Sequence, residues 1–173
     1  MTDAELLALC VFEEAGREPD DGRAAVARVV LNRMKKRFGS DGTIRGTVLA
    51  HNQFSWVEYD FVTVHSGTGT RLESHQEYQI VARTSDQILS RVSKLLIAAK
   101  GFPKTWARIS EIVAAVQAHN YSGPQYNFLT DDVVYYVNPK ILTKQPSWAI
   151  SKRLVCSIGN HNFYRADDPP AIV

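Results

Sequence analysis

Hydrophobic and polar residues follow the period of an α-helix through the first forty residues of the chain. The sequence TDAE at residues 2–5 has the pattern of a capping box, so a helix is predicted from about residue 3 to residue 15. Gly16 can end this helix. A second helix is predicted over residues 22–39, because one of its faces is apolar and its last turn is basic, which suits the negative end of a helix dipole.

The middle of the chain changes from extended to helical patterns. A threonine cap and a short helical turn are predicted from residue 43, followed by an aromatic, polar loop. Residues 57–71 look extended and then flexible. Helical periodicity then predicts one long helix, or two abutting helices, over residues 72–99, and a further helix over residues 105–118.

The last forty residues switch to the pattern of β-strands. Residues 133–137, VVYYV, are strand-like, residues 146–153 can form a helical turn, and residues 154–165 read as a hairpin that turns at Gly159-Asn160. Helices followed by a small antiparallel sheet define an α+β fold. No repeat or linker divides the sequence, so a single domain spanning residues 1–173 is predicted.

Composition adds modest constraints. With 45% hydrophobic and 22% charged residues, the chain can bury a core without disulfides, and the pattern does not decide whether Cys10 and Cys156 pair. The net charge of +2 weakly favours a polyanionic partner such as a bacterial wall and is too small to indicate nucleic-acid binding. No secretory signal peptide and no stable membrane insertion are expected, because the first residues lack a basic segment and no apolar run could span a bilayer.

Two adjacent carboxylates, Glu13 and Glu14, close the first predicted helix on its apolar side. On a helical wheel Glu14 projects between Cys10 and Leu7, and Glu13 projects beside Leu6. Burial raises the pKa of a carboxyl, which is what a general acid needs near neutral pH, as in enzymes that protonate a glycosidic oxygen. The alternative is a frayed helix end whose acids reach solvent or pair with arginines, and the wheel by itself favours that alternative.

Two other groups of residues are candidates for a site. The segment HNQFSW combines amide, hydroxyl and indole groups with aromatic rings, a composition that suits sugar recognition but also fills cores. The segments YYVNP and IGNHNFYR bring a histidine, His161, directly after the hairpin turn, although a lone histidine beside aromatic rings is more often structural. The sequence lacks HExxH, CxxC, GxSxG and Walker motifs, so no metal or other cofactor is expected.

Several blocks of the sequence stand in the order in which one enzyme family has them. They are EEAGREPDDGRAAVARVVLNR, QFSW, YYVNP, Trp148 and IGNHNFY, and in them the chain resembles the SleB-like cell wall hydrolases, which include spore cortex-lytic enzymes and phage lysins. The resemblance implies a mainly helical domain similar to lysozyme and the lytic transglycosylases. It also implies cleavage of peptidoglycan between N-acetylmuramic acid and N-acetylglucosamine.

The resemblance also implies roles for individual residues. The family pattern runs approximately G-E-A-R-G-E-P, so the catalytic acid falls on Glu14 and the second glutamate on Glu18, which is interpreted first as structural and second as a further acid. Glu13 replaces the family's glycine, and its charge would raise the pKa of Glu14 by repulsion. Substrate binding is assigned to Gln53, Ser55, Trp56, Tyr136, Asn138 and His161.

Two mechanisms are compatible with this assignment. A lysozyme-type muramidase needs a second carboxylate near the catalytic acid, for which the candidates are Glu18, Glu58 and Asp132. Without one, Glu14 acts first as acid and then as base in a lytic transglycosylase, the route that is slightly favoured. Hypotheses of other classes are an N-acetylmuramoyl-L-alanine amidase and a non-catalytic wall-binding or virion structural protein.

The expected partner is bacterial peptidoglycan, and a monomer is expected. Because no signal peptide is expected, a phage endolysin that a holin releases or a virion carries is the natural context. A bacterial protein whose leader has been removed fits the same sequence.

Overall fold

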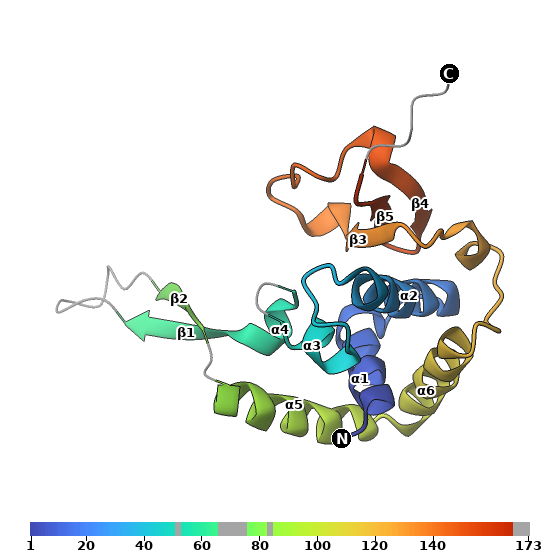
Figure 1. Ribbon diagram of the computed structural model, residues 1–173. Coiled ribbons are helices and arrows are strands. Elements are labelled where there is room, and N and C mark those ends of the chain that lie inside the picture. Colours follow the sequence, from blue (N-terminus) through green and yellow to red (C-terminus); the bar gives the residue numbers. More distant parts are fainter. Residues whose placement is uncertain (51–52, 66–75, 83–84, 168–173) are drawn as a thin grey trace.

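The computed structural model describes residues 1–50, 53–65, 76–82 and 85–167. Helices form the lower part of the molecule as drawn in Figure 1, a three-stranded sheet lies above them, and a two-stranded hairpin projects to one side. α1 (Asp3–Ala15) lies in the middle of the helices and contacts α2, α3, α5 and α6. Its residues from Leu6 to Val11 are all buried, so α1 forms the centre of the core.

The first two helices begin and end close to the residues that the sequence predicts. The Thr2 side chain accepts a hydrogen bond from the Glu5 amide, and the Glu5 carboxylate accepts one from the Thr2 amide, which confirms the capping box. Gly16 caps the end of α1. α2 (Asp20–Lys36) starts slightly earlier than predicted and ends where Arg37 adopts a left-handed conformation, with φ 53°.

Further helices surround this pair. A threonine cap at Thr43 accepts a hydrogen bond from the Gly46 amide, as predicted for the start of the third helix. The predicted helix over residues 105–118 is confirmed and begins with a proline in its first turn. The bounds are α3 (Ile44–Val48), α4 (Ser55–Glu58), α5 (Ser85–Lys100) and α6 (Pro103–Gln117).

The prediction of helix from residue 72 onwards is wrong for the segment 76–82. This segment is β2 (Gln76–Ala82), which pairs antiparallel with β1 (Tyr59–His65) from Tyr59 opposite Ala82 to His65 opposite Gln76. It contains aromatic and β-branched residues that favour strands, and its hydrogen-bond partner lies in a different segment, which helical periodicity does not reveal. Residues 66–75, predicted to be flexible and then helical, lie outside the described residues.

The second sheet is the small antiparallel sheet predicted near the C-terminal end of the sequence. Its strands are β3 (Val133–Val137), β4 (Leu154–Ile158) and β5 (His161–Arg165), in the order β3-β5-β4. The β4–β5 hairpin turns at Gly159, which has the left-handed φ of 59° that such a turn needs. Short 3-10 helices flank these strands: η1 (Tyr126–Phe128), η2 (Pro139–Ile141) and η3 (Ser151–Arg153).

Two polar side chains of α2 attach this sheet to the helices. The Asn32 amide donates hydrogen bonds to the carbonyls of Thr130, at 3.2 Å, and Val133, at 2.9 Å. The Arg33 guanidinium donates through Nε to the Val134 carbonyl at 2.7 Å. Both side chains are buried, so β3 is held in one position over α2.

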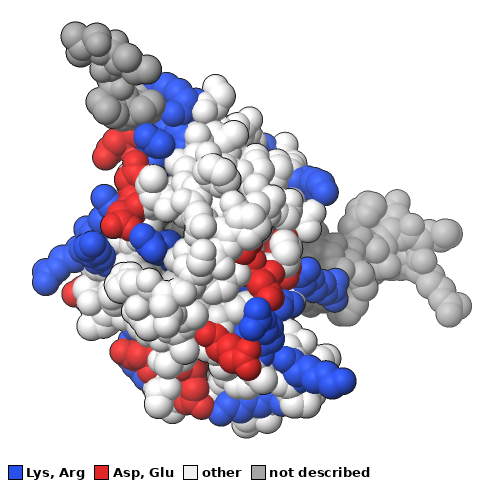
Figure 2. Space-filling view, turned by 90° about the vertical axis from the view of Figure 1, so that its right-hand side faces the viewer, with Lys and Arg blue, Asp and Glu red and all other residues white. Residues whose placement is uncertain are grey.

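The predicted α+β fold, mainly helical with a small sheet toward the C-terminus, is confirmed. Cys10 is buried in the core, Cys156 is half-buried, and both are free thiols. Among the described helices, none combines the length and the apolar character that a membrane span requires. On the face shown in Figure 2, lysines and arginines lie interspersed with acidic residues around a largely uncharged centre, so the small positive net charge is not concentrated there.

Candidate active site

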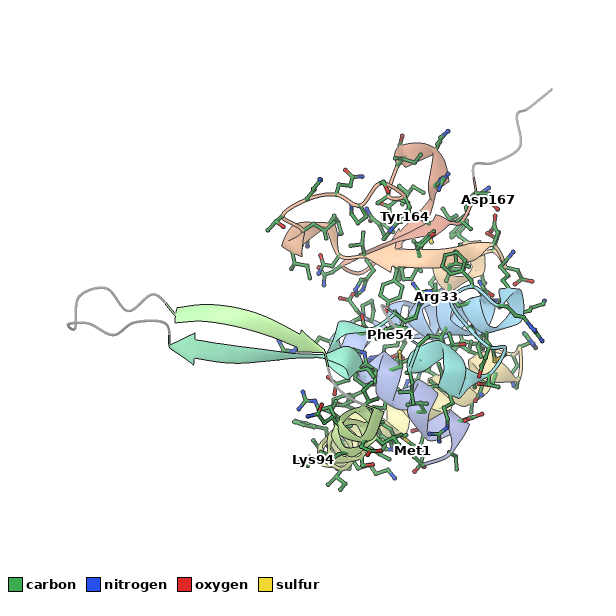
Figure 3. The ribbon with its side chains drawn as sticks, turned by 60° about the vertical axis from the view of Figure 1, so that its left-hand side comes forward. Met1, Arg33, Phe54, Lys94, Tyr164 and Asp167 are labelled. Atoms are coloured by element: carbon green, nitrogen blue, oxygen red, sulfur yellow. The ribbon has the colours of Figure 1, made fainter. Side chains whose placement is uncertain are left out.

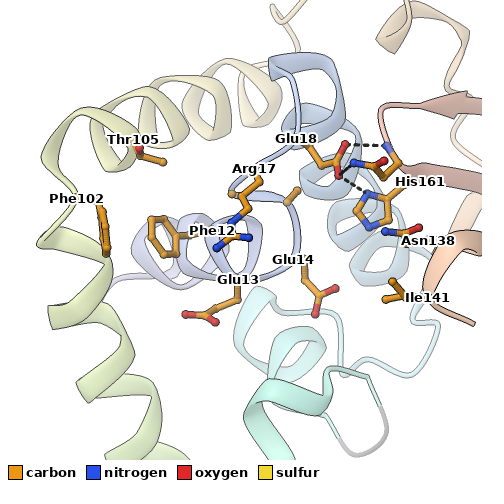
Figure 4. Close-up of a pocket in the computed structure, with 13 residues that line it drawn as sticks. Phe12, Glu13, Glu14, Arg17, Glu18, Phe102, Thr105, Asn138, Ile141 and His161 are labelled. Carbon is orange, nitrogen blue, oxygen red and sulfur yellow. Dashed lines mark hydrogen bonds and ion pairs between the residues drawn. The ribbon is translucent and has the colours of Figure 1, made fainter.

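A cleft of about 790 Å³ opens where the end of α1, the start of α6 and the edge of the sheet meet. In Figure 4, Glu14 lies between two groups of lining residues, with Phe12, Phe102 and Thr105 on one side and Asn138, Ile141 and His161 on the other. The lining is completed by Glu13, Ala15, Gly16, Arg17, Glu18 and Asn160. Residues far apart in the sequence thus surround one carboxyl.

The Glu14 carboxyl is half-buried in the last turn of α1, where β3 covers it. The Tyr136 hydroxyl donates a hydrogen bond of 2.9 Å to Glu14 Oε2. Burial raises the pKa of Glu14, whereas the Tyr136 hydroxyl, the Arg33 charge and the Trp56 indole act in the opposite direction. Burial has the largest effect, so Glu14 keeps its proton to a higher pH than an exposed glutamate does.

Glu13 behaves differently from its neighbour. Its side chain is exposed at the mouth of the cleft, so the prediction that both acids lie on the covered side of the helix is wrong for Glu13. A helical wheel gives the direction of a side chain but not whether another element covers it. Partial enclosure still raises the pKa of Glu13, and Arg91 lowers it. The repulsion that Glu13 exerts on Glu14 has the predicted sign but is a minor cause of the raised pKa.

Glu18 connects the loop after α1 to the β4–β5 turn. Its carboxylate accepts hydrogen bonds of 2.9 Å from both the backbone amide and the side-chain amide of Asn160. Glu18 Oε1 also lies 3.8 Å from His161 Nδ1 (Figure 4). The side chain is only 8% exposed, and its hydrogen bonds join the loop after α1 to the β4–β5 turn, while the structural role of Glu18 stays a prediction.

His161 and Asn138 stand at the edge of the sheet that faces the cleft. The His161 ring meets the Tyr136 ring edge to face, with centroids 5.3 Å apart. Burial lowers the pKa of His161, although Glu18 opposes this, so the neutral imidazole is favoured. The Asn138 side chain accepts a hydrogen bond from the Lys140 amide at the start of η2. Both predicted residues line the cleft.

The three predicted residues of the QFSW block, Gln53, Ser55 and Trp56, are not among the described residues that line the cleft. Trp56 is half-buried beside Phe54 and acts on the Glu14 carboxyl through its indole. Gln53 Oε1 accepts a hydrogen bond of 3.3 Å from Arg33. The backbone of Ser55 belongs to α4, but its side chain lies outside the described part.

The candidates for a second carboxylate are occupied elsewhere or not described. Glu18 accepts two hydrogen bonds from Asn160 and lies 3.8 Å from His161. Asp132 accepts a hydrogen bond from Thr130, lies 3.6 Å from Arg165, and is not among the residues of the cleft lining. The Glu58 side chain lies outside the described part. In the residues that the structure does describe, no cluster of histidine, cysteine or acidic side chains has the form of a metal site.

Several residues of the site were missed by sequence reasoning. Arg33 contacts Tyr136 and Gln53. The sequence could have indicated its burial, because Arg33 follows the buried Val29 and Val30 by four and three residues and so lies on the same face of the helix. Six further residues of the cleft lining had no local signal in the sequence, because tertiary packing decides which residues face the cleft. They are Phe12, Arg17, Phe102, Thr105, Ile141 and Asn160.

A helical domain with a small sheet and an open cleft, lined by carboxyls whose pKa is raised by burial, is an arrangement suited to acid–base chemistry on an extended substrate. Residues 17–164 match the family model described as Cell Wall Hydrolase, and the chain belongs to this family. The predicted family is therefore confirmed. The matched region begins just after Glu14 and includes the rest of the site.

Comparison with one solved structure supports this fold, and a second is similar at a lower score. The catalytic domain of the germination-specific lytic transglycosylase SleB from Bacillus anthracis is 21% identical, with 94% of this chain and 93% of that chain covered and a TM-score of 0.52. The catalytic domain of the Bacillus cereus SleB protein is also 21% identical, with coverages of 94% and 89% and a TM-score of 0.47. No curated protein matches the chain.

Proposed function

We propose that this cell wall hydrolase is a glycosidase that cuts the glycan strands of peptidoglycan, with Glu14 as the proton donor. The observation that carries the proposal is the Glu14 carboxyl itself, which lies in an open cleft with its pKa raised by burial. A carboxyl with a raised pKa keeps its proton to a higher pH and can donate it to a glycosidic oxygen. The SleB catalytic domain from Bacillus anthracis, which is described as a lytic transglycosylase, supports this proposal.

In the proposed reaction Glu14 protonates the oxygen that links N-acetylmuramic acid to N-acetylglucosamine. The bond from the muramyl C1 to that oxygen breaks, and positive charge develops on the muramyl ring. Glu14 is then a carboxylate, and the hydrogen bond from Tyr136 stabilises that charge. The acid must regain a proton before the next turnover.

The source of that proton separates the two mechanisms. A muramidase uses a second carboxylate to activate water or to form a covalent intermediate. Among the candidates whose side chains the structure describes, Glu18 and Asp132 have other partners, so we favour the lytic route. In this route Glu14 takes the proton of the muramyl 6-hydroxyl as the oxygen of that hydroxyl attacks C1. The product is a 1,6-anhydro sugar, and no water is consumed.

The cleft lining suits a substituted glycan. The amides of Asn138 and Asn160 can pair with N-acetyl groups and hydroxyls. Phe102 and Ile141 are 61% and 77% exposed on opposite sides of Glu14, and such apolar side chains can pack on sugar ring faces. An open cleft with polar and apolar walls fits a polymer that passes through it.

The test is the rate at which purified sacculi lose turbidity, followed by mass spectrometry of the products. Glu14→Gln should keep the fold and reduce the rate by about a hundredfold or more, because only the proton donor is removed. Glu111→Gln, which removes an exposed carboxylate on α6 outside the cleft, is the matched control. Equal rates for Glu14→Gln and the parent protein would refute the role of Glu14.

The products distinguish the remaining hypotheses. Anhydro-muramyl ends support the lytic transglycosylase, and reducing ends with added water support a muramidase. Released peptides with intact glycan strands would indicate an amidase, and binding without any clearing would indicate a wall-binding protein. Delivery by a holin or a virion, and the monomeric state, remain predictions that the source genome and a sedimentation measurement can test.

A further inference from the structure

Arg33 is a buried cation that contacts Tyr136, the residue whose hydroxyl donates a hydrogen bond to Glu14. Its side chain comes from α2, and the residue is only 8% exposed. Nε donates to the Val134 carbonyl of β3 at 2.7 Å, and Nη1 donates to Gln53 Oε1 at 3.3 Å. The guanidinium therefore connects α2, β3 and the segment before α4. Figure 3 shows Arg33 at this junction, above Phe54 and below the sheet.

Two aromatic rings complete the surroundings of this cation. The guanidinium carbon lies 5.5 Å from the centre of the Phe54 ring and 5.9 Å from the centre of the Tyr136 ring. A cation at these distances is attracted to the ring faces and restricts their movement. Tyr136 is the residue whose hydroxyl donates to Glu14, so Arg33 helps to fix the orientation of that hydrogen bond.

The charge of Arg33 has no direct anionic partner in the part of the chain that the structure describes. The contacts above are to a carbonyl, an amide oxygen and two rings, all of them neutral. A buried cation is costly unless some negative charge compensates it. Glu14 supplies that charge when it is ionised, and Arg33 accordingly lowers the pKa of Glu14.

The other groups that act on Glu14 cannot replace this cation. On α1, Glu13 raises its pKa by repulsion, and the Cys10 thiol is buried and neutral, with its own pKa raised well above the ordinary value. Tyr136 on β3 and Trp56 on α4 offer hydrogen bonds but no charge. Arg33 is therefore the cation among the described groups that favours the ionised state of Glu14.

We propose that Arg33 is a positioning residue for Glu14: it fixes the Tyr136 ring, whose hydroxyl donates to Glu14, and compensates the negative charge that Glu14 carries after it has donated its proton. Its role in turnover rests on the proposed function of Glu14. The positioning itself is a property of the free protein. It can therefore be measured without any substrate.

The first experiment is an NMR titration of the Glu14 carboxyl in the free protein, assigned by comparison with Glu14→Gln. Arg33→Met removes the charge and keeps an apolar side chain, and it should raise the titration midpoint of Glu14 by on the order of one pH unit. Lys36→Met is the matched control, because it removes one exposed cation three residues further along the same helix. It should leave the midpoint unchanged.

The second experiment is the pH profile of kcat/KM on sacculi. In Arg33→Met the limb at alkaline pH should move upward with the Glu14 pKa, while the maximal rate falls by about tenfold or more because the carboxylate is less well stabilised. Arg33→Lys keeps the charge but loses the planar contacts, so it should lower the rate and leave the limb in place. A residue that only stabilised the fold would lower the rate without moving either limb.

The outcomes are separable from those of the proposed function. A folded Arg33→Met with an unchanged Glu14 midpoint overturns the inference, and so does a lysine variant with the full parental rate. If Arg33→Met does not fold, Arg33→Gln takes its place in the NMR titration, because it removes the charge and keeps a hydrogen-bond donor. A raised Glu14 midpoint in that variant supports the inference, and an unchanged midpoint overturns it. A parent protein that fails to cleave sacculi refutes the proposed function, and the NMR titration still tests Arg33.

Discussion

Replacing Gly159 with alanine should break the connection between the β4–β5 turn and the loop after α1. Gly159 has a φ of 59°, and a Cβ atom placed there would lie 1.9 Å from Glu18 Oε2 and 3.0 Å from Pro19 Cδ. Atoms cannot approach so closely, and the Glu18 carboxylate must move. When it moves, its hydrogen bonds to the backbone and side chain of Asn160 are lost or distorted.

The expected cost has two parts. An alanine in the left-handed region is disfavoured by about 1–2 kcal/mol relative to the favoured backbone conformations. Loss of a hydrogen bond to a charged group costs about 1.5–3 kcal/mol, and Glu18 is only 8% exposed, so water replaces the lost partner poorly. We expect Gly159→Ala to lower the free energy of unfolding by roughly 3–5 kcal/mol. For a chain of this size that corresponds to a fall in Tm of roughly 10 °C.

The assay is urea denaturation and thermal unfolding of the parent protein, Gly159→Ala and a control variant. Gly42→Ala is the matched control, because Gly42 also has a positive φ, of 93°, but a Cβ there would lie at ordinary contact distance, 3.5 Å, from Arg37 Nε. The control therefore reports the backbone strain alone. It should lose about 1–2 kcal/mol, and the additional loss in Gly159→Ala measures the Glu18 contacts.

Equal destabilisation of the two variants would refute this account of Glu18. In that case the close approach at Gly159 would be relieved by small backbone shifts, and the hydrogen bonds to Asn160 would contribute little. Activity offers a second measurement, since Asn160 and His161 line the cleft. A displaced turn should lower kcat/KM at a temperature where Gly159→Ala is still folded, and the control should keep the parental value.

Two further substitutions test the surroundings of Glu14. Tyr136→Phe removes the hydroxyl that favours the ionised carboxyl, so the pKa of Glu14 should rise and the alkaline limb of the pH profile should move to higher pH. The rate on sacculi should fall by about tenfold or more. A pH profile equal to that of the parent protein would contradict this prediction. Glu13→Gln removes a repulsive charge, so the alkaline limb should move downward, by less than about half a pH unit because Glu13 is exposed and screened. An upward shift would contradict the assigned sign.

The elements that the sequence predicts best are those with local signals. α1 begins at a capping box and ends at a glycine, and both signals lie within a few residues of the helix ends. The β4–β5 hairpin is similarly defined by Gly159-Asn160. β2 was wrongly predicted as helix. Its hydrogen bonds are made to β1, a separate segment, and no pattern within residues 76–82 identifies that partner.

In the candidate site, too, residues with a local sequence signal were predicted, and residues that depend on tertiary packing were not. Glu14 was identified from its apolar surroundings on α1 and from the resemblance to a family, and the structure places it in the cleft. Arg33 belongs to a block that carried the resemblance, but its contact with Tyr136 depends on how β3 lies on α2. Phe102, directly before α6, and Ile141, at the end of η2, lie on opposite sides of the cleft. Their positions are properties of the packing, which a sequence pattern does not contain.

The difference between Glu13 and Glu14 shows why the chemistry of this site is non-local. The two carboxylates are neighbours in one helix, and the helical wheel placed both on the apolar side. β3 covers only one of them, and the Tyr136 hydroxyl that contacts Glu14 lies 122 residues further along the chain. Arg33 and Trp56 come from two other helices. The proton affinity of Glu14 is therefore determined by where the sheet rests on α2, so a substitution that shifts β3 should change the pH profile without touching the carboxyl.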